Sequence, residues 1–203
     1  MENQGFDFST INLPHEHVCL DFVNTTSNHQ KSSDDNLKRY ADLVSWALDV
    51  KLLNSDEAMQ LWQTASQQPG QAAHIHQQAL VLREAINRIL LAVAHDQTPD
   101  PADLDTLNLA LNEAMAHMRL RLADGSFGWT WEDAPHLEGI YWRVAWSAGE
   151  LLMSDLLQRV RQCEGCDWLF LDMGRGRKRR WCDMNTCGNR AKARRHYQRT
   201  KGK

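Results

Sequence analysis

Four of the five cysteines lie within a window of 25 residues near the carboxyl end, in the pattern C-x2-C-x15-C-x4-C. A C-x2-C turn brings two sulfurs to one ion, and four thiolates at about 2.3 Å satisfy the tetrahedral preference of Zn²⁺. The spacing therefore predicts one structural zinc ion per chain. Its expected ligands are Cys163, Cys166, Cys182 and Cys187.

Disulfide bonds and a catalytic metal are the alternatives to structural zinc for these cysteines. A disulfide framework needs an oxidising compartment, and the N-terminal stretch MENQGFDFSTINLP has neither the basic start nor the apolar run of a secretory signal. A catalytic zinc site keeps one position open for water, whereas four cysteines fill the shell. We therefore expect a cytoplasmic protein with a structural metal. The fifth cysteine, Cys19, is expected to be a small buried apolar residue.

The formal net charge of −3 hides an uneven distribution of charge along the chain. Residues 1–158 hold 9 basic and 22 acidic side chains, whereas residues 159–203 hold 14 basic and 4 acidic ones. This asymmetry is typical of an acidic body that carries a basic arm for a polyanion. We predict two domains, a mainly helical one over residues 1–158 and a zinc finger over residues 159–203.

Apolar residues recur three and four positions apart over much of the first domain, which predicts amphipathic helices. The expected helices cover residues 37–48, a segment with Ser55 as its N-cap, residues 76–96, a segment from Asp100 and Pro101 to about Met115, and residues 137–160. The period changes to two in MRLRLADGSFGWTWED, which predicts a β-hairpin turned at Asp124-Gly125, with Trp129 and Trp131 on one face. No apolar run is long enough for a transmembrane helix, so we expect no membrane partner.

The second domain is expected to be a small treble-clef-like ββα finger. WLFLD and KRRWC are predicted to form its two strands, and the chain after Thr186 its helix, with Cys187 in the first turn. Trp168, Phe170 and Trp181 are expected to form a miniature core, with stacking on bases as the alternative. So short and basic a segment buries too little apolar surface to fold alone. Zinc binding, which supplies about 10–16 kcal/mol, is expected to stabilise it.

The basic side chains of the finger are expected to contact nucleic acid, because phosphates relieve the repulsion among them. The expected contacts are Arg179, Arg180, Arg190, Lys192, Arg194, Arg195 and Arg199. The first two would hold the backbone of double-stranded DNA while the helix lies in the major groove. A solvated basic face, RNA binding and docking on an acidic protein are the alternatives.

Gly188 and Asn189 are predicted to act close to the zinc. Gly188 would permit close approach to the metal loop, and Asn189 would bond to a cysteine sulfur, a backbone group or an adenine, of which we favour support of the zinc site. Arg190 would either reach a guanine or pair with Asp183 or Asp172 to support the finger.

The finger sequence CEGCDWLFLDMGRGRKRRWCDMNTCGNRAKARRHYQR closely resembles the CGNR zinc finger, which is named for the run at residues 187–190. The first domain resembles the ABATE domain that usually precedes it, especially in CLDFVNT at 19–25 and DLVSWA at 42–47. The family is regarded as stress-induced bacterial transcription regulators. The resemblance therefore implies DNA binding by the finger.

The first domain is expected to be a sensor or dimerisation module rather than an enzyme, since it lacks a catalytic triad, a phosphate loop and an open metal signature. Its expected partners are a small-molecule effector and a second copy of the chain. His15, His17 and His29, with Asp21, raise a second metal or a ligand pocket as an alternative to surface and capping roles. A zinc-stabilised protein-interaction or RNA-binding module is the alternative function.

Overall fold

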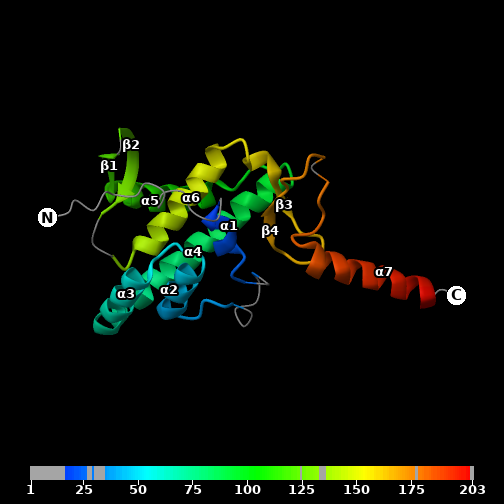
Figure 1. Ribbon diagram of the computed structural model, residues 1–203, viewed down its shortest axis with the longest axis horizontal. Helices are drawn as coiled ribbons and strands as arrows, with labels where there is room; N and C mark the ends of the chain where they lie inside the picture. Colours follow the sequence, from blue (N-terminus) through cyan, green and yellow to red (C-terminus); the bar gives the residue numbers. More distant parts are fainter. Residues whose placement is uncertain are drawn as a thin grey trace.

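A helical body makes up most of the molecule, and a smaller finger extends from it at the carboxyl end (Figure 1). The computed structural model describes residues 17–26, 29, 35–123, 125–132, 136–176 and 178–201, without the side chains of residues 123, 195, 196, 199 and 200. The body contains α1 (Val18–Val23), α2 (Tyr40–Asp49), α3 (Ser55–Gln67), α4 (Pro69–Ala94), α5 (Pro101–Ala116), β1 (Met118–Ala123), β2 (Ser126–Trp131) and α6 (Gly139–Met153). The finger contains η3 (Leu157–Arg159), β3 (Val160–Gln162), β4 (Leu169–Leu171), η4 (Met184–Gly188) and α7 (Asn189–Lys201).

The helix starts follow local capping chemistry. Asp100 caps α5 as predicted, because its carboxylate accepts a hydrogen bond of 2.9 Å from the Ala102 amide and Pro101 needs no partner at the first helical position. The predicted cap Ser55 is wrong by one residue. The N-cap of α3 is Asn54, whose side chain accepts from the Glu57 amide at 2.9 Å while the Glu57 carboxylate accepts from the Asn54 amide at 2.8 Å.

Helix α4 is the central element of the body, and α1, α2, α3, α5 and α6 all pack against it. Its buried apolar side chains recur with helical spacing, which gives it a continuous stripe facing the other helices. They include Ile75, Ala79, Leu82, Ile86, Ile89 and Leu90. Burial of a side chain such as Leu82 contributes about 1.5–3 kcal/mol, so this stripe contributes strongly to the stability of the body.

The predicted hairpin is present as β1 and β2, with Leu120 opposite Trp129 and Leu122 opposite Phe127. Gly125 has a φ of 77° in the turn, a conformation that favours glycine. Residues 129 and 131 lie on one face, as alternation requires. The paired side chains are 45–72% exposed, so this face of the hairpin is apolar and open to solvent.

Two predicted elements near the finger are wrong. The helix expected over 137–160 ends at Met153, because the chain turns at Ser154, whose hydroxyl accepts from the Leu156 amide at 3.2 Å. The strand expected at 178–182 does not form. The partner of β4 is β3, with Val160 opposite Leu171, because the fully buried side chains of Val160 and Leu169 join the core of the body.

The fold class is confirmed as mainly α, with one hairpin in the body and a ββα finger. None of the described helices combines the length and apolar content that a membrane crossing requires.

Candidate metal centre and nucleic-acid interface

The four predicted zinc ligands converge on one point. Their sulfur atoms lie within 4.8 Å of one another, and three of the separations are 3.6, 3.7 and 3.8 Å. Four sulfurs at the Zn–S distance of about 2.3 Å around a tetrahedral ion are about 3.8 Å apart. The described residues therefore fit one Zn²⁺ ion held by Cys163, Cys166, Cys182 and Cys187.

Backbone amides prepare Cys163 for metal binding. Its sulfur accepts hydrogen bonds from the Gly165 amide at 3.4 Å and the Cys182 amide at 3.3 Å. Although burial opposes the change, these amides lower the pKa of the Cys163 thiol to about 7. Burial raises the pKa of Cys166 to about 11, so these thiols ionise together only when a cation is supplied.

The loop around the sulfurs is tight. A Cβ atom on Gly165 would lie 3.0 Å from Cβ of Cys187, so glycine allows the two ligand-bearing turns to approach. A Cβ atom on Gly188 would lie 3.0 Å from Sδ of Met184, in the π-helical turn η4 that carries Cys187. Cys187 thus lies in the turn that directly precedes α7 rather than inside the first turn of that helix.

Arg190 and Asn189 both form hydrogen bonds to residues of η4. The guanidinium of Arg190 donates to Sγ of Cys187 at 3.1 Å, rather than pairing with Asp183 or Asp172. Those two carboxylates instead accept from backbone amides, that of Asp183 at the start of η4 and that of Asp172 in the loop that follows β4. The side chain of Asn189 donates to the Asn185 carbonyl at 3.0 Å. Its partner is therefore a backbone group rather than a cysteine sulfur.

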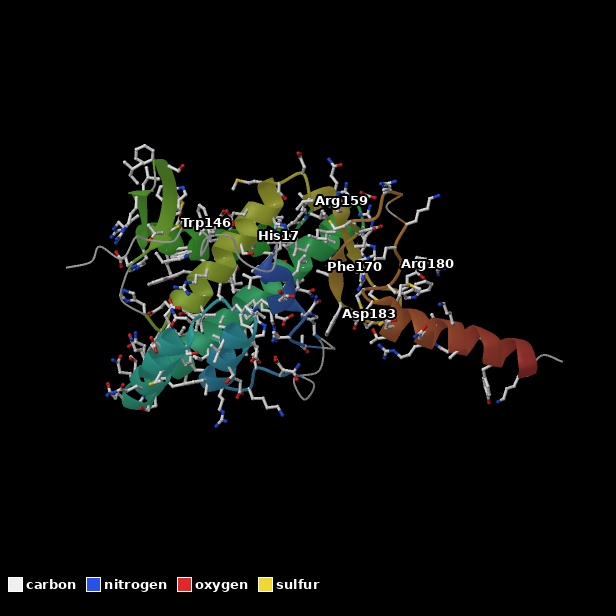
Figure 2. The ribbon with its side chains drawn as sticks, in the orientation of Figure 1. His17, Trp146, Arg159, Phe170, Arg180 and Asp183 are labelled. Atoms are coloured by element: carbon white, nitrogen blue, oxygen red, sulfur yellow. The ribbon has the colours of Figure 1, made fainter. Side chains whose placement is uncertain are left out.

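Arg179 and Arg180 also take part in the finger's own network. Arg179 donates to the Trp181 carbonyl at 2.8 Å and to the Cys182 carbonyl, and its guanidinium lies 5.0 Å from the centre of the Phe170 ring. Arg180 pairs with Glu164, with one hydrogen bond of 2.6 Å. Figure 2 shows Phe170, Arg180 and Asp183 together where the finger leaves the body.

Helix α7 projects from the finger away from the body (Figure 1). Lys192 and Arg194 are exposed on it, and Lys201 lies 4.9 Å from the ring centre of the exposed Tyr197. The side chains of Arg195 and Arg199 lie outside the described residues. Nucleic-acid contact by these side chains therefore stays a prediction.

The miniature core differs from the expected one in one residue. Phe170 and the partly buried Trp181 pack with the cysteines, as predicted. Trp168 is 41% exposed and is not part of this cluster, because it lies over the joint between body and finger.

Asn24 connects the finger to the body. Its side-chain amide donates to the Leu169 carbonyl at 2.8 Å, and its side-chain oxygen accepts from the Leu169 amide at 3.0 Å. The neighbouring Thr25 accepts a hydrogen bond of 3.0 Å from the buried Arg83 of α4. Asn24 belongs to the stretch 19–25 that resembles the ABATE domain, but its partner lies 145 residues away, so no local sequence pattern predicts this contact.

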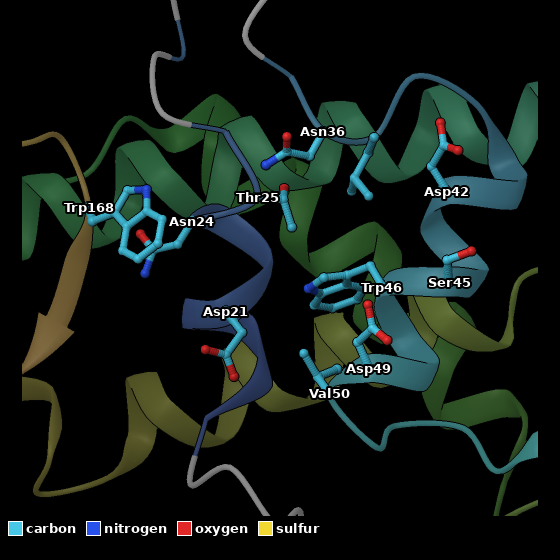
Figure 3. A pocket seen from close by; sticks show the side chains of 11 residues that line it. Asp21, Asn24, Thr25, Asn36, Asp42, Ser45, Trp46, Asp49, Val50 and Trp168 are labelled. Atoms are coloured by element: carbon cyan, nitrogen blue, oxygen red, sulfur yellow. The ribbon is translucent and has the colours of Figure 1, made fainter.

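Two clefts adjoin this joint. One has a volume of about 550 Å³ and is lined by α1, α2 and Trp168, and the other has about 660 Å³ and extends towards the cysteines. Asp21, Asn24 and Trp168 line both. Figure 3 shows Asp21 on α1 opposite Trp46 and Asp49 on α2, with Trp168 at the far end.

Of the histidines near the amino end, the two that the structure describes do not belong to a metal-binding group. His29 pairs with Glu84 at 2.8 Å, His15 lies outside the described residues, and His17 lines the larger cleft. Within the described part of the chain, the groups that could hold an ion include none of these histidines and not Asp21. Cys19 is fully buried, as predicted, and burial raises the pKa of its thiol to about 12.

Two family models match the chain. The ABATE model, described as "Putative stress-induced transcription regulator", matches residues 16–155. The CGNR zinc finger model matches residues 159–200. These matches confirm the resemblance seen in the sequence. No curated protein matches the chain.

Proposed function

Because the chain belongs to the ABATE family and carries a CGNR zinc finger, we propose that it is a bacterial transcription regulator that binds double-stranded DNA through α7. The observation that supports this most is the exposed basic helix α7, which a four-cysteine metal centre holds away from an acidic body. The metal has a structural role in this proposal, and the chain is not an enzyme.

The charge on α7 favours a polyanion. The helix contains basic residues and no acidic ones, and its 13 residues extend about 20 Å, enough to cross a major groove about 12 Å wide. The acidic body repels phosphates, so DNA approaches α7 from the side away from the body. Lys192 and Arg194 are the described side chains best placed to meet it.

A small-molecule effector fits the 550 Å³ cleft, which has the size of an ordinary ligand site. The described residues that line it include Asp21, Asp42 and Asp49 but no lysine or arginine, so a cationic or neutral effector suits it better than an anion. Such a ligand would touch Trp168, next to the Leu169 that Asn24 holds. Occupancy of the cleft would thereby change how firmly the finger sits on the body.

A second copy of the chain fits the apolar face of the hairpin. Leu120, Leu122, Phe127 and Trp129 are exposed there as two cross-strand pairs, and the hairpin lies at the opposite end of the molecule from α7 (Figure 1). Pairing of two hairpins would leave both fingers free. A dimer would raise DNA affinity through a second half-site, because one finger spans only a few base pairs.

Selection of bound fragments from random duplex DNA tests the proposal. Zinc-loaded full-length protein should enrich a sequence motif, and the combined substitution of Lys192 and Arg194 by alanine should abolish enrichment, whereas Lys38→Ala on the body should not. Equal retention of duplex DNA, RNA and heparin would support a general polyanion binder. Failure to retain any of them would overturn the proposal and favour docking on an acidic protein.

A further inference from the structure

A second group of metal-ligating side chains lies in the body, at the base of the hairpin. His117 follows the last turn of α5, Glu132 follows β2, and His136 precedes α6. Nδ1 of His117 is 2.9 Å from Oε2 of Glu132, and Nε2 of His136 is 3.5 Å from the same oxygen. One ligand atom from each residue lies within 4.8 Å of the other two.

The surroundings hold these side chains in place. The His117 ring stacks on Trp142 of α6, with 3.8 Å between centres and 12° between planes. The Glu132 amide donates to the His117 carbonyl at 3.1 Å, which ties the end of β2 to the end of α5. Arg119 bonds to the other oxygen, Oε1, of the Glu132 carboxylate, so Oε2 faces the two imidazoles. Partners that fix ligand orientation in this way are typical of metal sites.

A small cavity of about 20 Å³ adjoins the cluster, and His117, Glu132, His136 and Trp142 all line it. This volume is sufficient for one water molecule. Nε1 of Trp142 is buried and finds no hydrogen-bond acceptor among the described residues. Because Trp142 itself lines the cavity, a polar group bound there is the candidate partner for this N–H.

We propose that His117, Glu132 and His136 bind a divalent transition-metal ion such as Zn²⁺, with a water molecule as the fourth ligand. Two imidazoles and one carboxylate form a set that suits Zn²⁺, Co²⁺ or Ni²⁺ and disfavours Mg²⁺ and Ca²⁺, which prefer oxygen alone. The Arg119 guanidinium repels a cation, so this ion binds more weakly than the one held by four thiolates. The site goes beyond the proposed function and does not depend on it.

Cobalt titration of the full-length chain tests the proposal, because the absorption spectrum of bound Co²⁺ depends on whether its ligands are thiolates or nitrogen and oxygen atoms. Protein whose cysteine centre already holds zinc should bind one further equivalent of Co²⁺, with a weak visible spectrum and without the intense thiolate charge-transfer bands. His117→Ala, His136→Ala and Glu132→Gln should each weaken this binding at least tenfold. His74→Ala, which removes an exposed histidine of α4, is the matched control and should bind Co²⁺ like the unaltered chain.

Several outcomes would overturn the proposal. These are a chain that takes up no further Co²⁺ once its cysteines hold zinc, a second equivalent kept by all three variants, and a second equivalent with thiolate bands. Far-ultraviolet circular dichroism of each variant checks that the helices are retained. Glu132→Gln preserves the shape of the side chain and so keeps the test valid if an alanine variant fails to fold.

Discussion

Asn24 and Leu169 exchange two hydrogen bonds, of 2.8 and 3.0 Å, between the end of α1 and the start of β4. The side-chain amide of Asn24 thus matches the backbone donor and acceptor of Leu169 as another strand would. Because Val160 and Leu169 are also buried in the body core, the first hairpin of the finger is part of the body's packing. The finger is therefore anchored at its base and free at α7.

Asn24→Ala should loosen this anchor. The substitution leaves the partly buried amide and carbonyl of Leu169 without their partners, at a cost of about 1–3 kcal/mol. Hydrogen exchange should show faster exchange over residues 160–171, with the amides of α4 unchanged. Asn36→Ala, which alters an exposed asparagine, is the control, and equal exchange in the two variants would contradict the anchoring role.

Removal of zinc should unfold only the distal part of the finger. Without the ion the four cysteines are no longer joined through a metal, and the folding energy that zinc binding supplies is lost. We expect η4 and α7 to lose helical structure on treatment with a strong chelator, while β3 and β4 stay on the body through Val160 and Leu169. Exchange mass spectrometry with and without chelator measures this. Loss of protection in α4 would show that the body also depends on the metal.

Arg83 should be a sensitive position in the body. Its side chain is 4% exposed and bonds to both oxygens of Asp35, at 2.9 and 2.5 Å. Arg83→Met would leave the Asp35 carboxylate unpaired and should lower the free energy of unfolding by about 3–5 kcal/mol. Arg39→Met, which removes an exposed partner of Asp42, should cost less than about 1 kcal/mol in the same urea titration.

The same pair gives stability a defined pH dependence. Burial opposes ionisation, but the hydrogen bonds and charge of Arg83 hold the pKa of Asp35 below its usual value. The contribution is therefore complete above the unfolded pKa of about 3.9 and is lost as the pH falls through the lower folded value. The stability difference between the unaltered chain and Arg83→Met should be constant from pH 7 to about pH 5 and shrink below pH 4. A difference that persists undiminished at pH 2 would contradict the assignment.

The cysteine centre and most helices could be predicted because their signals are local. Cys163 and Cys166 stand at a spacing that one turn can close over an ion, and the apolar stripe of α4 repeats with the helical period. The hairpin showed a period of two and a glycine turn. In each case residues close together in the sequence determine the structure by themselves.

The remaining features depend on contacts between distant segments. The sequence of β3 continues a helical pattern, and its pairing with β4, Val160 opposite Leu171, forms where β3 packs against α4 and β4 against α1. The pairing of Asn24 with Leu169 spans 145 residues. Arg190 lies in a basic run, so the sequence predicts a nucleic-acid contact for it. Its hydrogen bond to Cys187 depends on the π-helical turn η4, which the sequence pattern does not predict.

The hairpin face should control self-association. Phe127→Glu would place a charge in the apolar face that the dimer is proposed to bury, and should shift sedimentation from dimer to monomer. Ser126→Glu adds the same charge to the neighbouring residue, on the opposite face of the strand, and should leave the dimer intact. A chain that sediments as a monomer before any substitution would remove the basis for this surface.

The arginines of the finger should separate into two groups. Arg190→Ala removes a donor to the Cys187 sulfur and should increase the rate of zinc loss to a chelator before it affects DNA contacts. Arg194→Ala should leave zinc retention unchanged and weaken binding to all duplexes alike. If Lys192, Arg194, Arg195 and Arg199 each neutralise one phosphate, log affinity should fall against log salt with a slope of about −4.

Loss of Arg194 should reduce that slope by about one unit. Zinc content, chelator kinetics and affinity for specific and random duplexes, measured on each variant, distinguish the two groups. An Arg190 variant that keeps its zinc but loses preference for the selected motif would show a contact with a base edge, because a bidentate bond to guanine contributes about 1–3 kcal/mol of discrimination. An Arg194 variant with unchanged affinity and slope, its zinc intact, would place the DNA contact elsewhere than on this face of α7.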